Sequence, residues 1–318
     1  MANGIAYSVV IPVFNEEDII NELYKRLTTV MDKLNEKYEI IFVDDGSKDR
    51  SFEILRELHR KDETIKIIRF SRNFGHHIAI TAGLDYAQGD AIILMDSDLQ
   101  DPPEEIPKLY EKFKEGYDVV YAIRKVRIDP FLKKLISKLF YRIFKIMSKT
   151  EIPPKSGVFR IMSRRVTDSI RICREKSRFI IGLISWSGFS HVGVETERDA
   201  RYGGDTKYNL LKSAKLGTEA ITSFSSFPLR IATYIGFFTA LCSFIVGIYM
   251  LIKKLFLGMP VSGYASIIVS VFFLGGVQLI IMGFMGEYIS RTYTEVQDRP
   301  LYIIKDRLGF SRIGVEND

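Results

Sequence analysis

The chain has 318 residues and a formal net charge of +6, from 45 Lys and Arg against 39 Asp and Glu. An apolar content of 47% excludes a disordered chain, and the presence of only 2 cysteines excludes a fold built on disulfides. The charge is unevenly distributed, with a net −9 over residues 1–123, +14 over 124–230 and +1 over 231–318. We therefore expect different segments to meet different partners. Met1 to Asn15 runs into strand-like sequence without a secretory signal, which predicts a cytoplasmic N-terminus.

Residues 6–122 alternate short apolar runs with helix-like polar segments. The apolar runs predict strands at Tyr7–Val13, Tyr38–Val43, Ile65–Phe70, Ala91–Met95 and Asp118–Ala122. The segments between and after them predict helices at Asn15–Asn35, Arg50–Lys61, Gly75–Ala87 and Pro103–Lys114. This order predicts an α/β domain with a mostly parallel sheet covered by helices, whose ligands lie at the carboxyl ends of the strands.

Polar motifs follow four successive predicted strands. They are Pro12-Val13-Phe14-Asn15-Glu16, Asp44-Asp45-Gly46-Ser47, Ser71-Arg72-Asn73 and Asp96-Ser97-Asp98. Each acid taken alone is compatible with a solvated turn or a helix cap. Four such motifs at four successive strand ends indicate a site for a nucleotide diphosphate. Neither GxGxxG nor GxxxxGK[ST] occurs, which argues against a dinucleotide dehydrogenase and a P-loop NTPase.

Asp96 and Asp98 are alternate residues just past a predicted strand, so they can aim two carboxylates at one point. Gln100 continues the same alternation with a neutral oxygen. Hard cations such as Mg²⁺ and Mn²⁺ prefer oxygen ligands and are commonly shared with phosphates. The sequence therefore predicts a divalent metal site at Asp96, Asp98 and Gln100.

The motifs PVFNE, VDDGSKD, SRNFGH and MDSDLQDPPE closely resemble those of inverting family 2 glycosyltransferases with the GT-A fold. The chain is most similar to polyprenyl-phosphate glycosyltransferases, which include dolichyl-phosphate mannose synthases and bactoprenol glucosyltransferases. Arg201–Tyr208 (RYGGDTKY) resembles the RYxGxSKY element of that subgroup. Thr222–Ser225 and Pro228–Arg230 resemble the run that leads into its membrane helices. The resemblance extends over residues 5–300.

The resemblance implies a Rossmann-like GT-A core over residues 1–128, completed by an acceptor-side region at 129–228. It implies a nucleotide pocket lined by Pro12, Phe14 and Glu16. Asp45, with Asp44, is expected to contact the base or ribose, and Arg72 is expected to assist there. The metal bound at Asp96 and Asp98 would neutralise the departing diphosphate during an in-line displacement at the anomeric carbon.

A basic cluster is placed for chemistry on phosphates. Arg124 and Arg127 follow the fifth predicted strand, and Arg201 and Lys207 flank a Gly-Gly turn. A nucleotide diphosphate and a lipid phosphate need cations to approach each other, and Arg suits phosphate oxygens. Individual surface arginines are often only solvated. The family element therefore favours Arg201 and Lys207 as acceptor and phosphate ligands, and Arg124 and Arg127 are further candidates.

The sequence departs from the family where a general base is sought. Many members have a DxGDFR-like element, whereas this chain has Lys155-Ser156-Gly157-Val158-Phe159-Arg160. No base is assigned from this element, although Ser156 and Arg160 are candidates to contact the acceptor or the donor. A phosphate monoester has a second pKa near 6, so a lipid phosphate acceptor is largely deprotonated at neutral pH and needs a strong base less than a sugar hydroxyl does.

The segment Pro130–Lys149 contains six bases, no acid and apolar residues at helical spacing. This pattern predicts an amphipathic helix in the membrane interface, with its bases near anionic headgroups. The alternative is a helix packed on its own domain with a solvated basic face. Nucleic-acid binding, another interpretation of a basic segment, is disfavoured by the acidic motifs and the apolar C-terminal stretches.

Ile231–Ile252 and Tyr264–Gly286 contain no charged residue over 22 and 23 positions. A bilayer core needs about 20 helical residues, so each stretch is long enough to span, and the short loop between them predicts a hairpin over residues 229–290. Buried soluble helices are the alternative. Basic residues on the flanks favour a cell-membrane protein with its catalytic domain and both termini, including a tail at 291–318, in the cytoplasm.

The predicted function is transfer of a hexose from a nucleotide sugar, most similar in pattern to UDP-glucose enzymes, to polyprenyl phosphate with inversion. GDP-mannose is the alternative donor. A processive polysaccharide synthase is disfavoured because the QxxRW motif is absent and Trp186 is the only tryptophan. A membrane nucleotide-sugar binder without catalysis is a further alternative. Glycines in the apolar stretches favour a homo-oligomer, and Leu301–Ile304 has the pattern of a strand that pairs with another chain.

Overall fold

The computed structural model describes residues 4–124, 156–197, 227–257 and 263–310. The chain forms two compact units. The first contains the described residues up to 197 together with 299–310, and the second contains the described residues from 227 to 298. Each unit is considered by itself below. The predicted interfacial helix at 130–149 lies outside the described residues. The candidate site residues Arg127, Arg201 and Lys207 also lie outside them.

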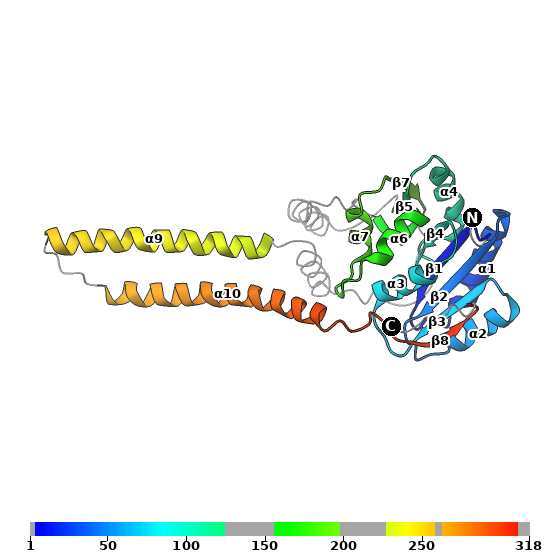
Figure 1. The fold of residues 1–318 in the computed structure, drawn as a ribbon, viewed down its shortest axis with the longest axis horizontal. Coiled ribbons are helices and arrows are strands. Elements are labelled where there is room, and N and C mark those ends of the chain that lie inside the picture. The colour runs from blue at the N-terminus through cyan, green and yellow to red at the C-terminus, as the bar shows by residue number, and fades with distance from the viewer. Residues whose placement is uncertain (1–3, 125–155, 198–226, 258–262, 311–318) are drawn as a thin grey trace. The chain divides into compact units, whose positions relative to one another are not determined.

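Within the described part of the first unit, eight strands form one mixed sheet with the order β7-β5-β6-β4-β1-β2-β3-β8 (Figure 1). The strands are β1 (Tyr7–Val13), β2 (Tyr38–Asp44), β3 (Ile65–Phe70), β4 (Ala91–Leu94), β5 (Val119–Arg124), β6 (Ser156–Ser163), β7 (His191–Thr196) and β8 (Ile304–Leu308). The pairs β4-β1, β1-β2, β2-β3 and β5-β7 are parallel, and β6 and β8 run antiparallel to their neighbours. The predicted α/β class with a mostly parallel sheet is therefore confirmed.

Helices cover both faces of this sheet. They are α1 (Ile20–Lys33), α2 (Ser51–Lys61), α3 (His76–Tyr86), the 3₁₀ turn η1 (Pro103–Glu105), α4 (Ile106–Lys114), α6 (Arg164–Ile172) and α7 (Ile180–Trp186). The central strands β1 and β2 are buried almost throughout because both faces are covered. This explains why their sequences are continuous apolar runs rather than alternating ones.

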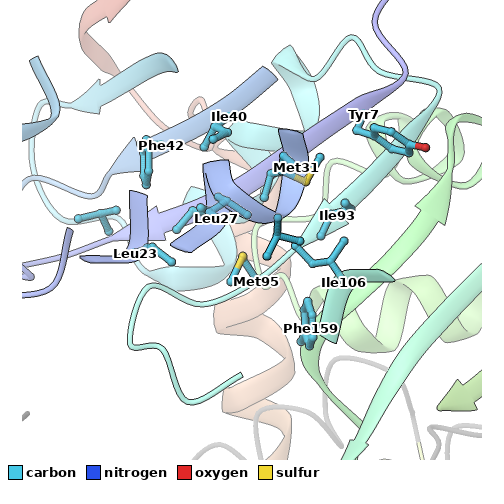
Figure 2. Packing of buried hydrophobic residues seen from close by; sticks show 14 of the residues in the cluster. Tyr7, Leu23, Leu27, Met31, Ile40, Phe42, Ile93, Met95, Ile106 and Phe159 are labelled. Atoms are coloured by element: carbon cyan, nitrogen blue, oxygen red, sulfur yellow. The ribbon is translucent and has the colours of Figure 1, made fainter. Parts of the chain in front are cut away.

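The main core lies between the sheet and α1, α2 and α4 (Figure 2). The amphipathic spacing of α1 buries Leu23, Leu27 and Met31 against alternate side chains of β1, β2 and β4. Phe42 and Phe159 are fully buried in the same layer. The core thus joins the first four strands and β6 into one rigid platform.

The opposite face of the sheet is covered by α3, which contacts α6 and α7 as well as β1 and β2. A Cβ added at Gly83 of α3 would lie 2.2 Å from Cγ1 of Val10, so glycine is required where this helix crosses β1. Arg164 and Arg171 of α6 donate to the carbonyls of Leu84, Ala87 and Gly89 at the end of α3. Cations at a helix C-terminus satisfy its last carbonyls and its dipole.

Helix α1 begins at Ile20 and not at Asn15, where the sequence predicted its start. Asn15 has φ of 56°, and its backbone N–H donates to the Ser47 hydroxyl at 3.0 Å. The N–H groups of Glu16 and Glu17 donate to side chains of the next loop. The residues after β1 therefore form a loop anchored to a neighbouring loop, because side-chain acceptors replace the helical bonds.

The C-terminal strand differs from the sequence prediction in position and partner. Leu301–Ile304 was expected to pair with another chain, but β8 begins at Ile304 and pairs antiparallel with β3 of the same chain. Arg69 is opposite Asp306 in this register, and their side chains form an ion pair at 3.7 Å. The tail therefore completes the sheet of its own chain at the edge where β3 would otherwise be unpaired.

The second unit contains two long helices, α9 (Phe227–Leu257) and α10 (Tyr264–Val296), which run antiparallel side by side (Figure 1). Both are long and apolar enough to cross a membrane, with candidate spans at Ala232–Tyr249 and Ser270–Val296. The predicted hairpin is confirmed, and α10 continues ten residues beyond the predicted end at Gly286. Large exposed apolar side chains along both helices, such as Phe237, fit a lipid environment.

Candidate active site

The four polar motifs lie together at the carboxyl ends of β4, β1, β2 and β3, which are adjacent and parallel. The loop after β1 is fastened to the loop after β2 by several side-chain bonds. The side-chain Oδ1 of Asn15 accepts from the N–H of Lys48 at 2.8 Å, and Ser51 Oγ accepts from the N–H of Glu16 at 2.9 Å. Asp49 accepts from the N–H of Glu17 at 3.2 Å. The PVFNE and DDGS motifs therefore form one structural unit.

Pro12 is buried within β1, and Phe14, the first residue after this strand, is 43% exposed. Glu16 is partly buried, and its carbonyl accepts from the N–H of Ile19 and Ile20. Among the three predicted pocket residues of this motif, Phe14 therefore presents the most accessible side chain, and Pro12 acts within the sheet.

Asp44 is fully buried at the end of β2. Its Oδ1 accepts from the N–H of Ser47 at 2.8 Å, and its Oδ2 lies 3.3 Å from Nε of Arg69. Burial raises the pKa of Asp44, while the bonds from Ser47 and the charge of Arg69 act in the opposite direction. The Arg69 guanidinium also lies over the ring of Phe52, 4.0 Å from its centroid. Asp44 therefore shapes the turn after β2.

Asp45 is also buried, and its carboxylate accepts from the backbone N–H groups of Phe74 at 2.6 Å and Gly75 at 2.9 Å. Burial raises the pKa of Asp45, and these two N–H groups offset part of that effect. Gly75 directly precedes α3, so the carboxylate also meets the positive end of that helix. Asp45 thus fixes the SRNFG loop, whose Arg72 is exposed and lies over the ring of Phe74 at 4.3 Å.

Gly46 lies where the second and third motifs approach most closely. Its φ is +72°, and a Cβ added there would be 2.6 Å from the backbone carbon of Arg72 and 2.8 Å from the nitrogen of Asn73. Both the left-handed backbone conformation and the lack of space require glycine. The sequence motif Asp-Asp-Gly-Ser therefore has a steric basis at its third position.

The Asp96-Ser97-Asp98 motif follows β4 directly. Asp96 Oδ1 lies 3.3 Å from Nε2 of His76, the first residue of α3, and the Asp96 side chain is 31% exposed. Asp98 Oδ1 accepts from the N–H of Gln100 at 3.1 Å, and Leu99 between them has φ of 54°. This turn leaves Asp96, Asp98 and Gln100 partly exposed at one edge of the sheet.

Two partly exposed carboxylates on one short turn fit a hard divalent cation in their oxygen chemistry. No group of three or more His, Cys, Asp or Glu side chains in the described parts of the chain is arranged to hold an ion. A cation at Asp96 and Asp98 would therefore need further oxygen ligands from water or from a bound phosphate, as is usual for Mg²⁺.

Arg160 is buried in β6, opposite Leu94 of β4 and Tyr121 of β5. Its guanidinium donates to the carbonyls of Val158 at 3.2 Å and Gly157 at 2.6 Å. Burial lowers the pKa of Arg160 to about 10, so the side chain stays charged at neutral pH. A buried cation two residues before Asp96 in the β4 register contributes a positive potential to this edge of the sheet.

His77 of α3 packs edge-on against Phe179, with ring centroids 5.6 Å apart. Burial first, and then the charges of His76, Arg178 and Arg160, lower the pKa of His77 from 6.5 to about 4. His77 is therefore neutral at physiological pH.

The depressed pKa of His77 predicts a loss of stability in acid. Between pH 6.5 and about 4 the unfolded chain binds a proton that the folded chain does not, so stability falls as the pH falls through this window. The shift corresponds to about 3 kcal/mol. We expect His77→Phe to flatten the pH dependence of the apparent melting temperature in this window. The exposed His191, replaced in the same way, is the control, and a His77→Phe curve parallel to that of the wild type would contradict the expectation.

Several candidate residues lie at the border of the described chain. Arg124 is the last residue of β5, and Ser156 is the first residue of β6 and is opposite Ile123. Only the backbone of Arg124 and Ser156 is described. The last residue of β5 and the first residue of β6 therefore lie close together, at the same edge of the sheet as the four motifs.

His76 and His77 were not among the residues selected from the sequence. The contact of His76 with Asp96 joins the third and fourth motifs, and the charges of Arg178 and Arg160 help to keep His77 neutral. The sequence does contain a signal for His76 as a site residue, because it directly follows the SRNFG motif near the start of a predicted helix. What the sequence could not indicate is that this helix begins beside the end of β4.

The mixed sheet, the joined strand-end motifs and the pair of partly exposed carboxylates fit the GT-A class of glycosyltransferases. Comparison with known families agrees with this class. Residues 8–171 match the glycosyl transferase family 2 model, and residues 227–292 match the GtrB C-terminal hairpin model. The chain belongs to glycosyltransferase family 2 and is a glycosyltransferase.

Curated relatives match almost the whole chain. An uncharacterized glycosyltransferase, YkcC of Bacillus subtilis, is 50% identical over 310 residues, covering 97% of this chain and 96% of the relative. The bactoprenol glucosyl transferase of Shigella phage SfII is 46% identical over 299 residues, covering 94% and 97%. The prophage bactoprenol glucosyl transferase homolog of Escherichia coli is 46% identical over 299 residues, covering 94% and 98%. The predicted family and subgroup are confirmed.

Among solved structures, glucosyl-3-phosphoglycerate synthase from Mycobacterium tuberculosis, in complex with Mn²⁺, uridine-diphosphate-glucose and phosphoglyceric acid, is 19% identical. The matched region covers 70% of this chain and 79% of the synthase chain, with a TM-score of 0.49.

Proposed function

We propose that this enzyme transfers glucose from UDP-glucose to a polyprenyl phosphate of the bactoprenol type, with inversion at the anomeric carbon. The observation that carries the proposal is the similarity to bactoprenol glucosyl transferases, which extends over 94% of the chain and so includes both the catalytic unit and the hairpin. The four motifs at one edge of the sheet support it, because nucleotide ligands of parallel sheets bind at the carboxyl ends of strands.

The nucleotide would lie across the loops after β1, β2 and β3. The exposed side chains of Phe14 and Arg72 are available to contact it, and the buried Asp44 and Asp45 hold the loops that present them. The resemblance implies a contact from Asp45, with Asp44, to the base or ribose. The bonds that they make favour a role for Asp45 in orienting the Arg72 loop.

Asp96 and Asp98, with Gln100, would hold a divalent cation, Mg²⁺ or Mn²⁺. When bound, the cation would neutralise the negative charge of the departing nucleotide diphosphate. His76 would keep the Asp96 carboxylate in position through its 3.3 Å contact. Because a histidine and a carboxylate already interact there, a change at His76 is expected to alter cation affinity.

The acceptor phosphate would meet basic side chains and a hydroxyl group, for which the candidates are Arg124, Arg127, Arg160, Arg201 and Lys207, and Ser156. Arg160 has the best structural support, because it is a buried cation whose described hydrogen bonds go only to carbonyls of its own strand. A phosphate monoester is mostly ionised at neutral pH, so the attacking oxygen would need no strong general base.

The hairpin would anchor the enzyme in the cell membrane, with the catalytic unit and both termini in the cytoplasm. Support comes from the two apolar helices and from bases on their flanks, such as Arg299. We further propose a homo-oligomer in the membrane and an interfacial helix at Pro130–Lys149. Crosslinking of the purified enzyme in lipid tests the first, and labelling of engineered cysteines from each side of the membrane tests the orientation.

A donor panel tests the proposed function. Purified enzyme in detergent would be incubated with polyprenyl phosphate, Mg²⁺ or Mn²⁺, and radiolabelled UDP-glucose or GDP-mannose. We expect label in the organic extract from UDP-glucose, dependent on both the lipid phosphate and the cation. Extractable label from GDP-mannose alone would identify a mannosyltransferase, and none from any nucleotide sugar would favour a binding protein without catalysis.

A further inference from the structure

The segment that follows α10 is part of the catalytic unit, although it comes last in the chain. Its strand β8 lies on β3, the strand that leads into the Arg72 loop. The carbonyl of Ile303 accepts from the N–H of Ser71 at 3.0 Å. The first residue of the Arg72 loop, Ser71–Gly75, is therefore held by the C-terminal segment, and the last is held by Asp45.

Tyr302 makes the most specific contacts of this segment. Its ring stacks on Phe70, with centroids 5.1 Å apart and an interplanar angle of 17°. Its hydroxyl donates to Oδ2 of Asp85 in α3 at 2.8 Å. Arg174 donates to the same oxygen at 2.8 Å, so Asp85 is fixed from two sides. Burial and the Asp85 carboxylate raise the pKa of Tyr302, which keeps the phenol a hydrogen-bond donor.

The contacts of Tyr302 continue into the Arg72 loop through aromatic rings. Phe70 packs edge-on against Phe74, with centroids 5.5 Å apart, and the Arg72 guanidinium lies over Phe74 at 4.3 Å. One continuous set of ring contacts thus connects Tyr302 to the guanidinium of Arg72. Such stacked and edge-on pairs have preferred geometries, so displacing one ring displaces the next.

A second connection runs through charges. Asp306 of β8 lies 3.7 Å from Nη1 of Arg69, and Nε of Arg69 lies 3.3 Å from Asp44. The C-terminal segment therefore contacts residues that support two of the strand-end motifs. Both connections reach the loops through residues of β3, Phe70 in the first case and Arg69 in the second.

We propose that Tyr302 is a positioning residue of the donor site, and that the C-terminal segment sets the conformation of the Arg72 loop that meets the nucleotide. The inference rests on the proposed function, since it takes this loop to be part of the nucleotide pocket. Residues 297–301 alone separate α10 from Tyr302, so the end of the membrane hairpin is followed directly by this positioning element.

The test compares Tyr302→Ala and Tyr302→Phe with wild type in detergent, using calorimetric binding of UDP with Mn²⁺ and steady-state kinetics. We expect Tyr302→Ala to raise the Kd for UDP and the KM for UDP-glucose about tenfold, which is a common size for the loss of one ordering contact. The KM for polyprenyl phosphate should stay unchanged. Tyr302→Phe keeps the stack and should restore most of the affinity. Lys305→Ala, at an exposed position of β8, is the matched control.

An unchanged Kd and KM in Tyr302→Ala would overturn the proposal. So would a loss of active enzyme or of melting temperature with normal KM in the folded fraction, because that is the result for a purely structural contact. If Tyr302→Ala does not fold, Tyr302→Leu decides, because it removes the ring stack and the hydroxyl but keeps an apolar side chain of moderate size, and normal UDP affinity in Tyr302→Leu overturns the proposal. Failure of the wild type to bind UDP would instead contradict the proposed function and is seen separately.

Discussion

Asp96→Asn is expected to lower the rate of sugar transfer by at least about a thousandfold, or about 4 kcal/mol of transition-state stabilisation. Asparagine keeps the size of the side chain and one oxygen, but it removes the negative charge that a divalent cation needs. Asp96 is partly exposed at the carboxyl end of β4 and touches His76, so the change should leave the buried sheet intact. Asp98→Asn should have an effect of the same order.

The control is Asp90→Asn. Asp90 is exposed and lies just before β4, at the amino end of the same strand and so at the opposite edge of the sheet. It should retain wild-type activity. The measurement is steady-state transfer with both Mg²⁺ and Mn²⁺ varied to saturation, together with the melting temperature of each variant. If Asp96→Asn kept more than a tenth of the wild-type rate, the catalytic role of this motif would be wrong.

Gly46→Ala is expected to destabilise the catalytic unit by about 2–5 kcal/mol and to weaken nucleotide binding. A left-handed conformation costs an alanine about 1–2 kcal/mol, and overpacking adds about 1–3 kcal/mol. The added Cβ would lie 2.6 Å from the backbone of Arg72, which cannot rotate away as a side chain could. The Arg72 loop must therefore shift. The measurements are the apparent melting temperature and the Kd for UDP with Mn²⁺.

Gly188→Ala separates the two effects. Gly188 has φ of +75°, close to the +72° of Gly46, but a Cβ there meets nothing within 4 Å. This variant should lose only the conformational part of the stability and keep normal UDP affinity. Equal losses of stability in the two variants, with equal UDP affinity, would show that the close approach of Gly46 to the Arg72 loop has no consequence.

The adjacent parallel strands β4, β1, β2 and β3 could be predicted from the sequence because most of their residues are buried. The runs at Tyr7–Val13 and Ile65–Phe70 match β1 and β3 residue for residue. Strand β7 gave no such signal, since most of its side chains are half-buried or exposed. Strand β8 depends on a pairing with β3 that is distant in sequence, and no local pattern specifies that partner.

The motifs of the site could be recognised in the sequence. The hydrogen bonds and the burial of the individual side chains could not. Asp45 stood out as a candidate ligand, and the structure shows its oxygens accepting from the N–H groups of Phe74 and Gly75, 29 and 30 residues away. Arg160 was identified from its motif, while its burial follows from the antiparallel position of β6 between β4 and β5. Long-range packing determines the contacts of these two side chains.

The central claim is that one hexose is transferred to a lipid phosphate. Mass spectrometry of the lipid extract, after incubation of wild-type enzyme with polyprenyl phosphate, UDP-glucose and Mg²⁺ or Mn²⁺, tests it most directly. We expect the polyprenyl monophosphate to gain one hexose and no phosphate, with this product absent for Asp96→Asn and present for Asp90→Asn. An unchanged lipid, or a product carrying a hexose on a diphosphate, would contradict the account.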